Sequence, residues 1–165
     1  MLCYYFSMLA IQTKAPAFTL KDESGVSHKL SDYKGKWVII YFYPKDDTPG
    51  CTKEACTIAA VYDEFAALGV TVLGVSKDSP ESHALFKEKY NLPFTLLSDP
   101  SAKMMEKYGA WQERSMYGKK FMGTARMTYV LNPKGQIVKV YPKVSPATHA
   151  LQLLKDIKKS LEGEK

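Results

Sequence analysis

The run Trp37-Val38-Ile39-Ile40-Tyr41-Phe42-Tyr43 is followed at once by Pro44-Lys45-Asp46-Asp47-Thr48-Pro49-Gly50-Cys51-Thr52-Lys53-Glu54-Ala55-Cys56. The seven residues from Trp37 to Tyr43 are continuously apolar, which is typical of a central strand covered on both faces. Pro49 and Gly50 end the loop that follows and predict the start of a helix. That helix would carry Cys51 in its first turn and Cys56 five residues later. A strand, a short loop and a cysteine at a helix start therefore predict both the fold and the site.

Strands and helices are predicted to alternate on both sides of this stretch. The predicted elements are a hairpin of residues 15–20 and 28–30 around a polar turn at 22–25, a helix from Gly50 to about Leu68, a strand at 70–75, a helix from Ser79-Pro80 to about Tyr90, a strand at 94–97, two strands at 128–131 and 136–141, and a last helix opened by Ser145-Pro146. Two apolar stripes would face the core, formed by Cys51, Ala55, Ile58, Tyr62 and Phe65 and by Ala147, Ala150, Leu151, Leu154 and Leu161. This order indicates an α/β fold, with a central mixed sheet sandwiched by helices and an N-terminal β-hairpin.

The length and charge of the chain exclude several classes of protein. The 165 residues suit one domain, expected at 8–165, with residues 1–7 as an apolar extension that lacks the positive charge of a secretory signal. No apolar run approaches the roughly 20 residues needed to cross a bilayer. The net charge of +6 comes from scattered residues, which indicates a solvated basic surface rather than a nucleic-acid interface. Three cysteines, of which Cys3 lies in the extension, do not form a disulfide scaffold and favour a cytoplasmic location.

The position of Cys51 favours nucleophilic chemistry. A helix N-terminus offers free backbone N–H groups and the positive end of the helix dipole, and both stabilise a thiolate. On a regular helix, five residues rise roughly 7.5 Å and turn roughly 140°, so the Cα atoms of Cys51 and Cys56 would lie about 8–9 Å apart on different faces. A disulfide tolerates Cα separations up to about 7 Å. A bond between these cysteines therefore requires the helix to unwind over roughly residues 51–59.

Each residue of the motif also has a plainer interpretation. Cys56 alone could be a buried small hydrophobe. Thr48 could hydrogen-bond the thiolate or an oxygen held beside it, or serve as a helix N-cap, or do both. Pro44 could shield the sulfur from water or simply end the strand. A zinc site is disfavoured because the cysteine gap is four, no second pair appears, and His28, His83 and His149 are isolated in the sequence.

Taken together, these residues resemble a known family. Pro44-x-x-x-Thr48-x-x-Cys51 matches the peroxiredoxin active-site motif, and the run from Asp46 to Cys56 closely resembles the peroxiredoxin Q subfamily, also called bacterioferritin comigratory protein. The segments 14–20, 111–120 and 126–131 are similar to the family's entry segment, its later loop and its arginine-bearing strand entry. The resemblance spans about residues 8–160.

The resemblance implies a thioredoxin-like fold and a hydroperoxide substrate. It makes Cys51 the peroxidatic cysteine, which becomes a sulfenic acid, and Cys56 the resolving cysteine, which condenses with it to a disulfide. Thr48 and Arg126 would complete the peroxide site, and Pro44 would cover it. Arg126 would supply a planar, always charged group beside the sulfur. The implied reductant is thioredoxin, the implied state is a monomer, and neither a cofactor nor a metal is expected.

Two other functions share parts of this pattern. A thiol–disulfide oxidoreductase of thioredoxin type would share the fold, but it normally needs two residues between its cysteines and a cis-proline facing them. Here the gap is four, and Met127 rather than proline precedes Thr128. A non-enzymatic protein, such as a peroxide sensor that relays oxidation to a partner or a chaperone-like holdase, would use the same sulfenate chemistry. The sequence leaves the relay function open.

Overall fold

A seven-stranded sheet forms the centre of the computed structural model, which describes residues 9–163. The predicted extension at 1–7, with Cys3, therefore lies outside the described residues. The strands are β1 (Thr19–Asp22), β2 (Ser27–Lys29), β3 (Trp37–Phe42), β4 (Val70–Ser76), β5 (Thr95–Ser98), β8 (Met127–Leu131) and β9 (Ile137–Tyr141), in the order β2-β1-β5-β4-β3-β8-β9. Strand β4 is parallel to β3 and β5, and the other pairings are antiparallel. The predicted mixed sheet is confirmed.

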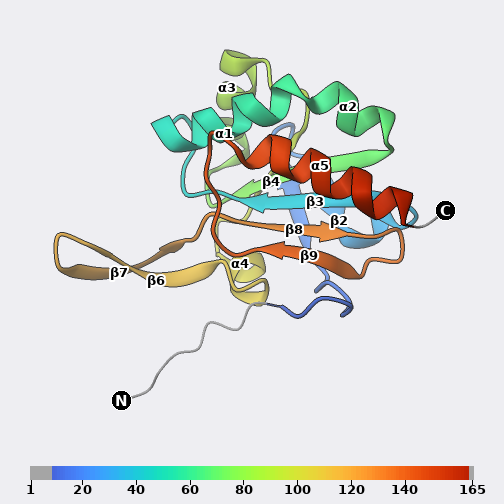
Figure 1. Cartoon of the computed structure of the whole chain (residues 1–165). Helices are drawn as coiled ribbons and strands as arrows, with labels where there is room; N and C mark the ends of the chain where they lie inside the picture. The colour runs from blue at the N-terminus through green and yellow to red at the C-terminus, as the bar shows by residue number, and fades with distance from the viewer. Residues whose placement is uncertain (1–8, 164–165) are drawn as a thin grey trace.

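Helices cover both faces of this sheet, as predicted. Helices α1 (Pro49–Ala60), α2 (Tyr62–Ala67), α3 (Pro80–Tyr90) and α5 (His149–Glu162) lie on one side, and α4 (Lys103–Lys107) lies on the other (Figure 1). A short 3-10 helix, η1 (Leu30–Tyr33), follows β2. Along β3, Ile39 and Tyr41 pack into the core under α1, α3 and α5, whereas Ile40 and Phe42 pack into the second core with α4. None of the helices in residues 9–163 combines the length and apolar character needed to cross a bilayer.

The N-terminal hairpin is present and joins the main sheet. Strands β1 and β2 pair antiparallel with Thr19 opposite Lys29, and the other side of β1 pairs with β5. The first strand begins at Thr19, four residues later than expected. The hairpin therefore forms one edge of the central sheet.

The predicted single helix from Gly50 to Leu68 is wrong in one respect, because the helix breaks at Val61. That residue has φ −112° and ψ 11°, so it ends α1 and precedes α2. Its N–H donates to the carbonyl of Ile58, three residues back, which tightens the last turn of α1. Tyr62, expected in the core, is only half-buried beyond this break. Gly69, with φ +75°, ends the segment as predicted.

The last helix begins later than its Ser-Pro signal indicates. Residues 145–148 form a turn in which the Ser145 carbonyl accepts hydrogen bonds from the N–H groups of Thr148 and His149. Helix α5 then starts at His149, and of the predicted stripe Ala150 and Leu154 are buried. Ala147 and Leu151 are exposed, and Leu161 is only partly buried. The buried residues of α5 are His149, Ala150, Leu153, Leu154 and Ile157.

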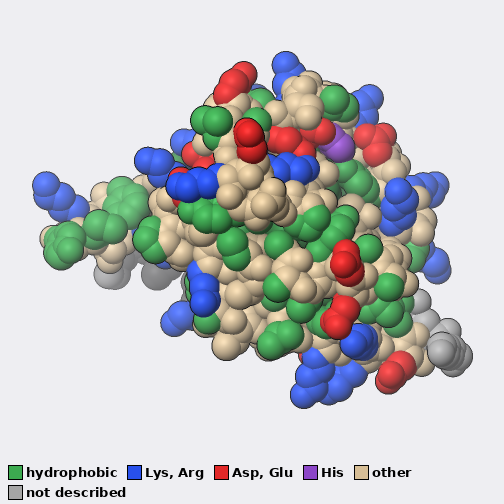
Figure 2. All heavy atoms as spheres, turned by 90° about the horizontal axis from the view of Figure 1, so that it is seen from above, with side chains coloured by type: hydrophobic (Ala, Val, Ile, Leu, Met, Phe, Trp, Pro, Cys, Tyr) green, Lys and Arg blue, Asp and Glu red, His purple; other side chains and the backbone are tan. Residues whose placement is uncertain are grey.

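The segment expected as a loop at 111–120 is part of a separate two-stranded arm. Strands β6 (Trp111–Met116) and β7 (Lys119–Thr124) pair antiparallel and project from the body of the molecule (Figure 1). Tyr117 and Gly118 both have positive φ, which suits a tight hairpin turn. Figure 2 shows hydrophobic and basic side chains on the projecting arm. The arm carries four exposed large apolar residues, Met116, Tyr117, Phe121 and Met122.

Candidate active site

Cys51 lies in the first turn of α1, at the end of the central strand β3. Thr48 is the N-cap residue, Pro49 is the first helical residue, and the Thr52 N–H donates to the Thr48 carbonyl at 2.8 Å. The N–H groups of Gly50 and Cys51 precede this first helical hydrogen bond, so they point out of the helix end. Cys51 is 2% exposed. The site thus combines a shielded sulfur with backbone donors that can hold an anion.

The guanidinium of Arg126 connects the sulfur to a buried carboxylate. Arg126 follows the arm strand β7 and immediately precedes β8. Its Nη2 lies 3.5 Å from Cys51 Sγ, and its Nη1 donates to Glu54 Oε2 at 2.6 Å. A Cβ atom at Gly50 would lie 3.0 Å from Arg126 Nη2, so the missing side chain gives the guanidinium its place. The structure thus brings Arg126 to Cys51 from a position 75 residues away.

Glu54 is a site residue that the sequence analysis missed. It is fully buried one turn after Cys51, and burial raises the pKa of its carboxyl to about 7 although Arg126 opposes this shift. Its Oε1 and the hydroxyl of Tyr41 are buried without a hydrogen-bond partner among the described residues. Burial also raises the pKa of Tyr41, with Glu54 and Cys51 adding to the effect. The i, i+3 spacing from Cys51 was the available signal, because it places both side chains on neighbouring positions of the helix surface.

The carboxyl of Glu54 is expected to make stability depend on pH. Because its pKa is raised from 4.5 to about 7, the folded chain holds more protons than the unfolded chain between these values. The free energy of unfolding should therefore fall as the pH rises through this window, by up to about 3 kcal/mol at about 1.4 kcal/mol per pKa unit. Urea unfolding of the wild type and Glu54→Gln at several pH values checks this. An equal pH slope in both proteins would contradict it.

Thr48 and Pro44 lie in the loop between β3 and α1. The Thr48 hydroxyl donates to the Lys45 carbonyl at 2.9 Å, which leaves its oxygen lone pairs free to accept a hydrogen bond. In this state its proton is directed to the loop and not to the thiolate. Pro44 is exposed just after the strand end. The roles of Thr48 in the peroxide site and of Pro44 as its cover stay predictions.

Cys56 lies on a different side of α1. It is half-buried and lines an open hollow of about 380 Å³ with Tyr90, Lys53 and residues 47–49. Cys51, by contrast, is buried against Arg126. Both cysteines are free thiols in one uninterrupted helix that runs to Ala60. The structure confirms that the two lie on different faces of one helix, so a bond between them requires the helix to open.

The three histidines, isolated in the sequence, each have polar partners in the fold. His28 contacts Asp22 and Tyr33, and His149 Nε2 lies 2.8 Å from the Thr128 hydroxyl. His83 is fully buried beside Asp46 and Asp78, and these three could in principle hold a metal ion. Their donor atoms, however, take part in hydrogen bonds within the protein. The sequence could not reveal this grouping, because it brings together a loop and two separate segments.

Comparisons with known proteins agree with one another. The model of the AhpC/TSA family matches residues 11–140. The chain is 48% identical over 146 residues to a putative peroxiredoxin bcp of Coxiella burnetii, covering 88% of this chain and 97% of that protein. It is 46% identical over 152 residues to peroxiredoxin Bcp of Bacillus subtilis, covering 90% and 97%. A solved structure of the Xanthomonas campestris bacterioferritin comigratory protein, described as having alkyl peroxide reduction activity, superposes with a TM-score of 0.83 at 38% identity, covering 87% and 91%.

Proposed function

Since the chain belongs to the AhpC/TSA family and its relatives are peroxiredoxins of the Bcp group, we infer that it is a thiol-dependent peroxidase. Its fold is thioredoxin-like, its substrate is a peroxide, and its reductant is a thiol compound. The observation that carries the assignment to particular residues is the Arg126 Nη2 donor at 3.5 Å from Cys51 Sγ. This contact supports Cys51 as the sulfur that reacts.

In the first step, the Cys51 thiolate attacks one oxygen of the hydroperoxide. An S–O bond forms, the O–O bond breaks, and the other oxygen leaves and takes up a proton to become water or an alcohol. The sulfur loses two electrons and the peroxide gains them. Negative charge on the peroxide oxygens is stabilised by Arg126 and by the N–H groups at the start of α1, which are already in place before reaction. The Thr48 hydroxyl oxygen accepts the hydrogen bond of the peroxide, since the hydroxyl proton is donated to the Lys45 backbone carbonyl.

In the second step, the Cys56 thiol condenses with the Cys51 sulfenic acid. A disulfide forms and water leaves, so no net oxidation occurs in this step. Because the two thiols lie on different faces of α1, the first turns of the helix unwind before the bond can form. While the helix stays folded, the sulfenate remains exposed to a second peroxide and to conversion into sulfinate.

A dithiol then returns the enzyme to its starting state. Its thiolate attacks the Cys51–Cys56 disulfide, and exchange regenerates the two enzyme thiols while the reductant is oxidised to its own disulfide. Thioredoxin fits this role, and we place the reaction in the cytoplasm with the enzyme as a monomer. The presence of both cysteines on one chain supports the monomeric cycle, because no second subunit has to supply a thiol.

Oxidation by one equivalent of peroxide tests this sequence of steps. We expect the reduced wild type to lose two hydrogens in mass spectrometry and to give a Cys51–Cys56 cross-linked peptide on the monomer. Cys56→Ser should instead gain one oxygen on Cys51 and react with sulfenate probes, but fail to turn over with thioredoxin. A wild type that forms only intermolecular disulfides, or a Cys56→Ser variant that keeps full turnover, would contradict the resolving role of Cys56.

A further inference from the structure

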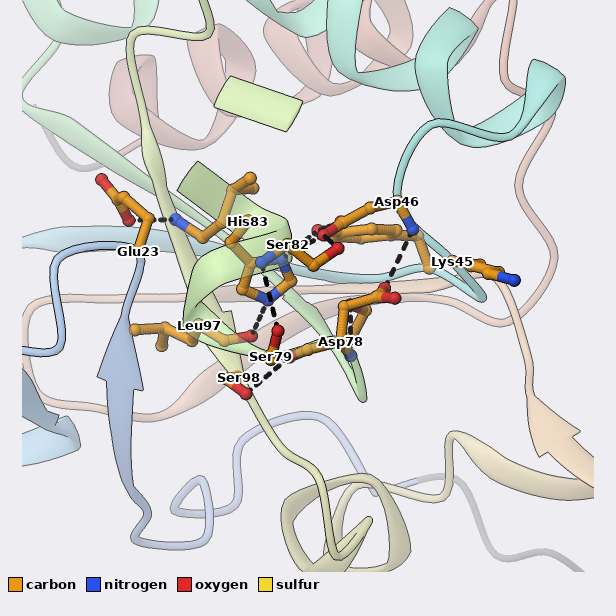
Figure 3. A network of polar contacts seen from close by, with 12 residues as sticks. Glu23, Lys45, Asp46, Asp78, Ser79, Ser82, His83, Leu97 and Ser98 are labelled. Carbon is orange, nitrogen blue, oxygen red and sulfur yellow. Dashed lines mark hydrogen bonds and ion pairs between the residues drawn. The ribbon is translucent and has the colours of Figure 1, made fainter. Parts of the chain in front are cut away.

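The loop that leads to Cys51 contains one deeply buried carboxylate. Asp46 is 7% exposed, although its neighbours Lys45 and Asp47 are exposed. Figure 3 shows Asp46 turned inward toward Ser82 and His83. Its Oδ1 accepts from the Tyr43 hydroxyl at 2.6 Å, and its Oδ2 accepts from Ser82 Oγ at 2.8 Å and lies 2.7 Å from His83 Nδ1. None of these contacts reaches the reacting sulfur, so the reaction steps leave them unexplained.

The partners of His83 hold its ring from two sides. Its Nε2 lies 3.0 Å from the Leu97 carbonyl, which can only accept, so Nε2 carries a proton. Its Nδ1 lies 2.7 Å from Asp46 Oδ2, and the Asp46 oxygens also accept from two hydroxyl groups. His83 and Asp46 thus form a buried, hydrogen-bonded pair between the loop and helix α3.

This pair belongs to a network that ties the loop to three other segments. His83 and Ser82 lie in α3, and Leu97 lies in β5. The Asp46 N–H donates to Asp78 Oδ2 at 2.9 Å (Figure 3). That oxygen also accepts from the Ser76 hydroxyl at the end of β4. On the outer side of the loop, Asp47 pairs with Lys89 and Tyr90 of α3. The loop is thus held from inside and outside just before α1 begins.

We propose that the Asp46–His83 pair is a clamp that keeps the first turn of α1 folded, and that His83 is a positioning residue for Cys51. The proposal rests on the proposed function, since it concerns the unwinding of α1 that precedes the Cys51–Cys56 disulfide in that cycle. Thr48 ends the clamped loop, and its carbonyl accepts the first hydrogen bond of α1. While the clamp holds this carbonyl in place, Cys51 stays beside Arg126. Releasing the clamp favours the unwound form in which Cys51 can reach Cys56.

Hydrogen exchange of the reduced protein, without peroxide, tests the clamp. In His83→Gln, the hydrogen-bonded amides of residues 52–56 should exchange about tenfold faster, the change that about 1.4 kcal/mol of lost anchoring produces. His28→Gln is the matched control, because His28 also lies 2.7 Å from an aspartate and contacts a tyrosine hydroxyl, but in the remote hairpin. It should leave amide exchange at residues 52–56 unchanged. Ser82→Ala, which removes one donor to Asp46, should give a smaller increase and decides the matter if His83→Gln does not fold.

A kinetic measurement separates positioning from general destabilisation. In stopped-flow experiments, His83→Gln should slow Cys51 oxidation and speed the later disulfide step, which lowers sulfinate formation under excess peroxide. Unchanged exchange at residues 52–56 in both His83→Gln and Ser82→Ala, or an equal rise across β3, would overturn the clamp. If the wild type proves inactive toward peroxide while exchange rises as expected, the clamp stands and only the peroxidase assignment fails.

Discussion

Replacing Cys51 by serine is expected to abolish peroxide turnover completely. A serine hydroxyl stays protonated at neutral pH and is a far weaker nucleophile than a thiolate, and Arg126 at 3.5 Å cannot compensate for that difference. The exchange is nearly isosteric at a site that is 2% exposed, so the fold should remain. Peroxide consumption with thioredoxin as the reductant should fall to the level of the uncatalysed reaction.

Recycling of the wild type separates the enzyme from a peroxide sensor of the same fold. Cys56→Ser is the control for Cys51→Ser, since it should keep a single oxidation of Cys51 but lose turnover. A peroxide sensor would show the single oxidation in the wild type without rapid recycling by thioredoxin. Turnover that survives in Cys51→Ser would refute the assignment of this residue, and with it the proposed cycle.

Replacing Arg126 by methionine should slow the oxidation of Cys51 by about 10²- to 10³-fold, the usual cost of removing one preorganised donor to a developing anion. The guanidinium contacts both Sγ and Glu54, so its loss removes the fixed positive charge beside the sulfur. The cost in folding stability should be limited, because Glu54 already has a pKa of about 7 and can take a proton when its partner is gone. Arg126→Lys should restore part of the rate, since it keeps the charge but not the two-pronged geometry.

A double variant distinguishes catalysis from support of the fold. Arg126→Met combined with Glu54→Gln removes the unpaired carboxylate and should recover stability without recovering rate. The oxidation rate is measured by stopped flow and the free energy of unfolding by urea titration. Both are compared among the wild type, Arg126→Met, Glu54→Gln and the double variant. If the double variant regained the oxidation rate together with its stability, Arg126 would act through the fold and not on the peroxide.

The strand, loop and helix around Cys51 could be predicted from the sequence because each carries a strong local signal. The apolar run of β3, the Pro49-Gly50 start of α1 and the Ser79-Pro80 start of α3 all lie where expected. The Ser79 side chain does accept from the Ser82 N–H, as an N-cap should. The helical spacing of Cys51 and Cys56 was likewise sufficient to place them on different faces.

What the sequence did not reveal depends on contacts between distant segments. Glu54 looks like an ordinary exposed helix residue until Arg126, at the base of the arm, is brought beside it. His83 becomes buried only because the loop at Asp46 folds onto α3. The strands of the arm are mostly exposed, and their apolar residues do not alternate regularly with polar ones, so the periodicity gave no strand signal. The break at Val61 is a matter of local backbone angles that no single residue type announces.

Because the two cysteines lie on different faces of α1, the reductant can distinguish the oxidised enzyme from the reduced one. A molecule with the Cys51–Cys56 bond cannot also have an intact first turn of α1, so its outline at residues 49–56 differs from that of a molecule ready for peroxide. A reductant that binds only the unwound conformation would not bind the reduced enzyme. The reductant would then recognise the disulfide form by its shape before thiol exchange begins, and it would not bind molecules that are already reduced.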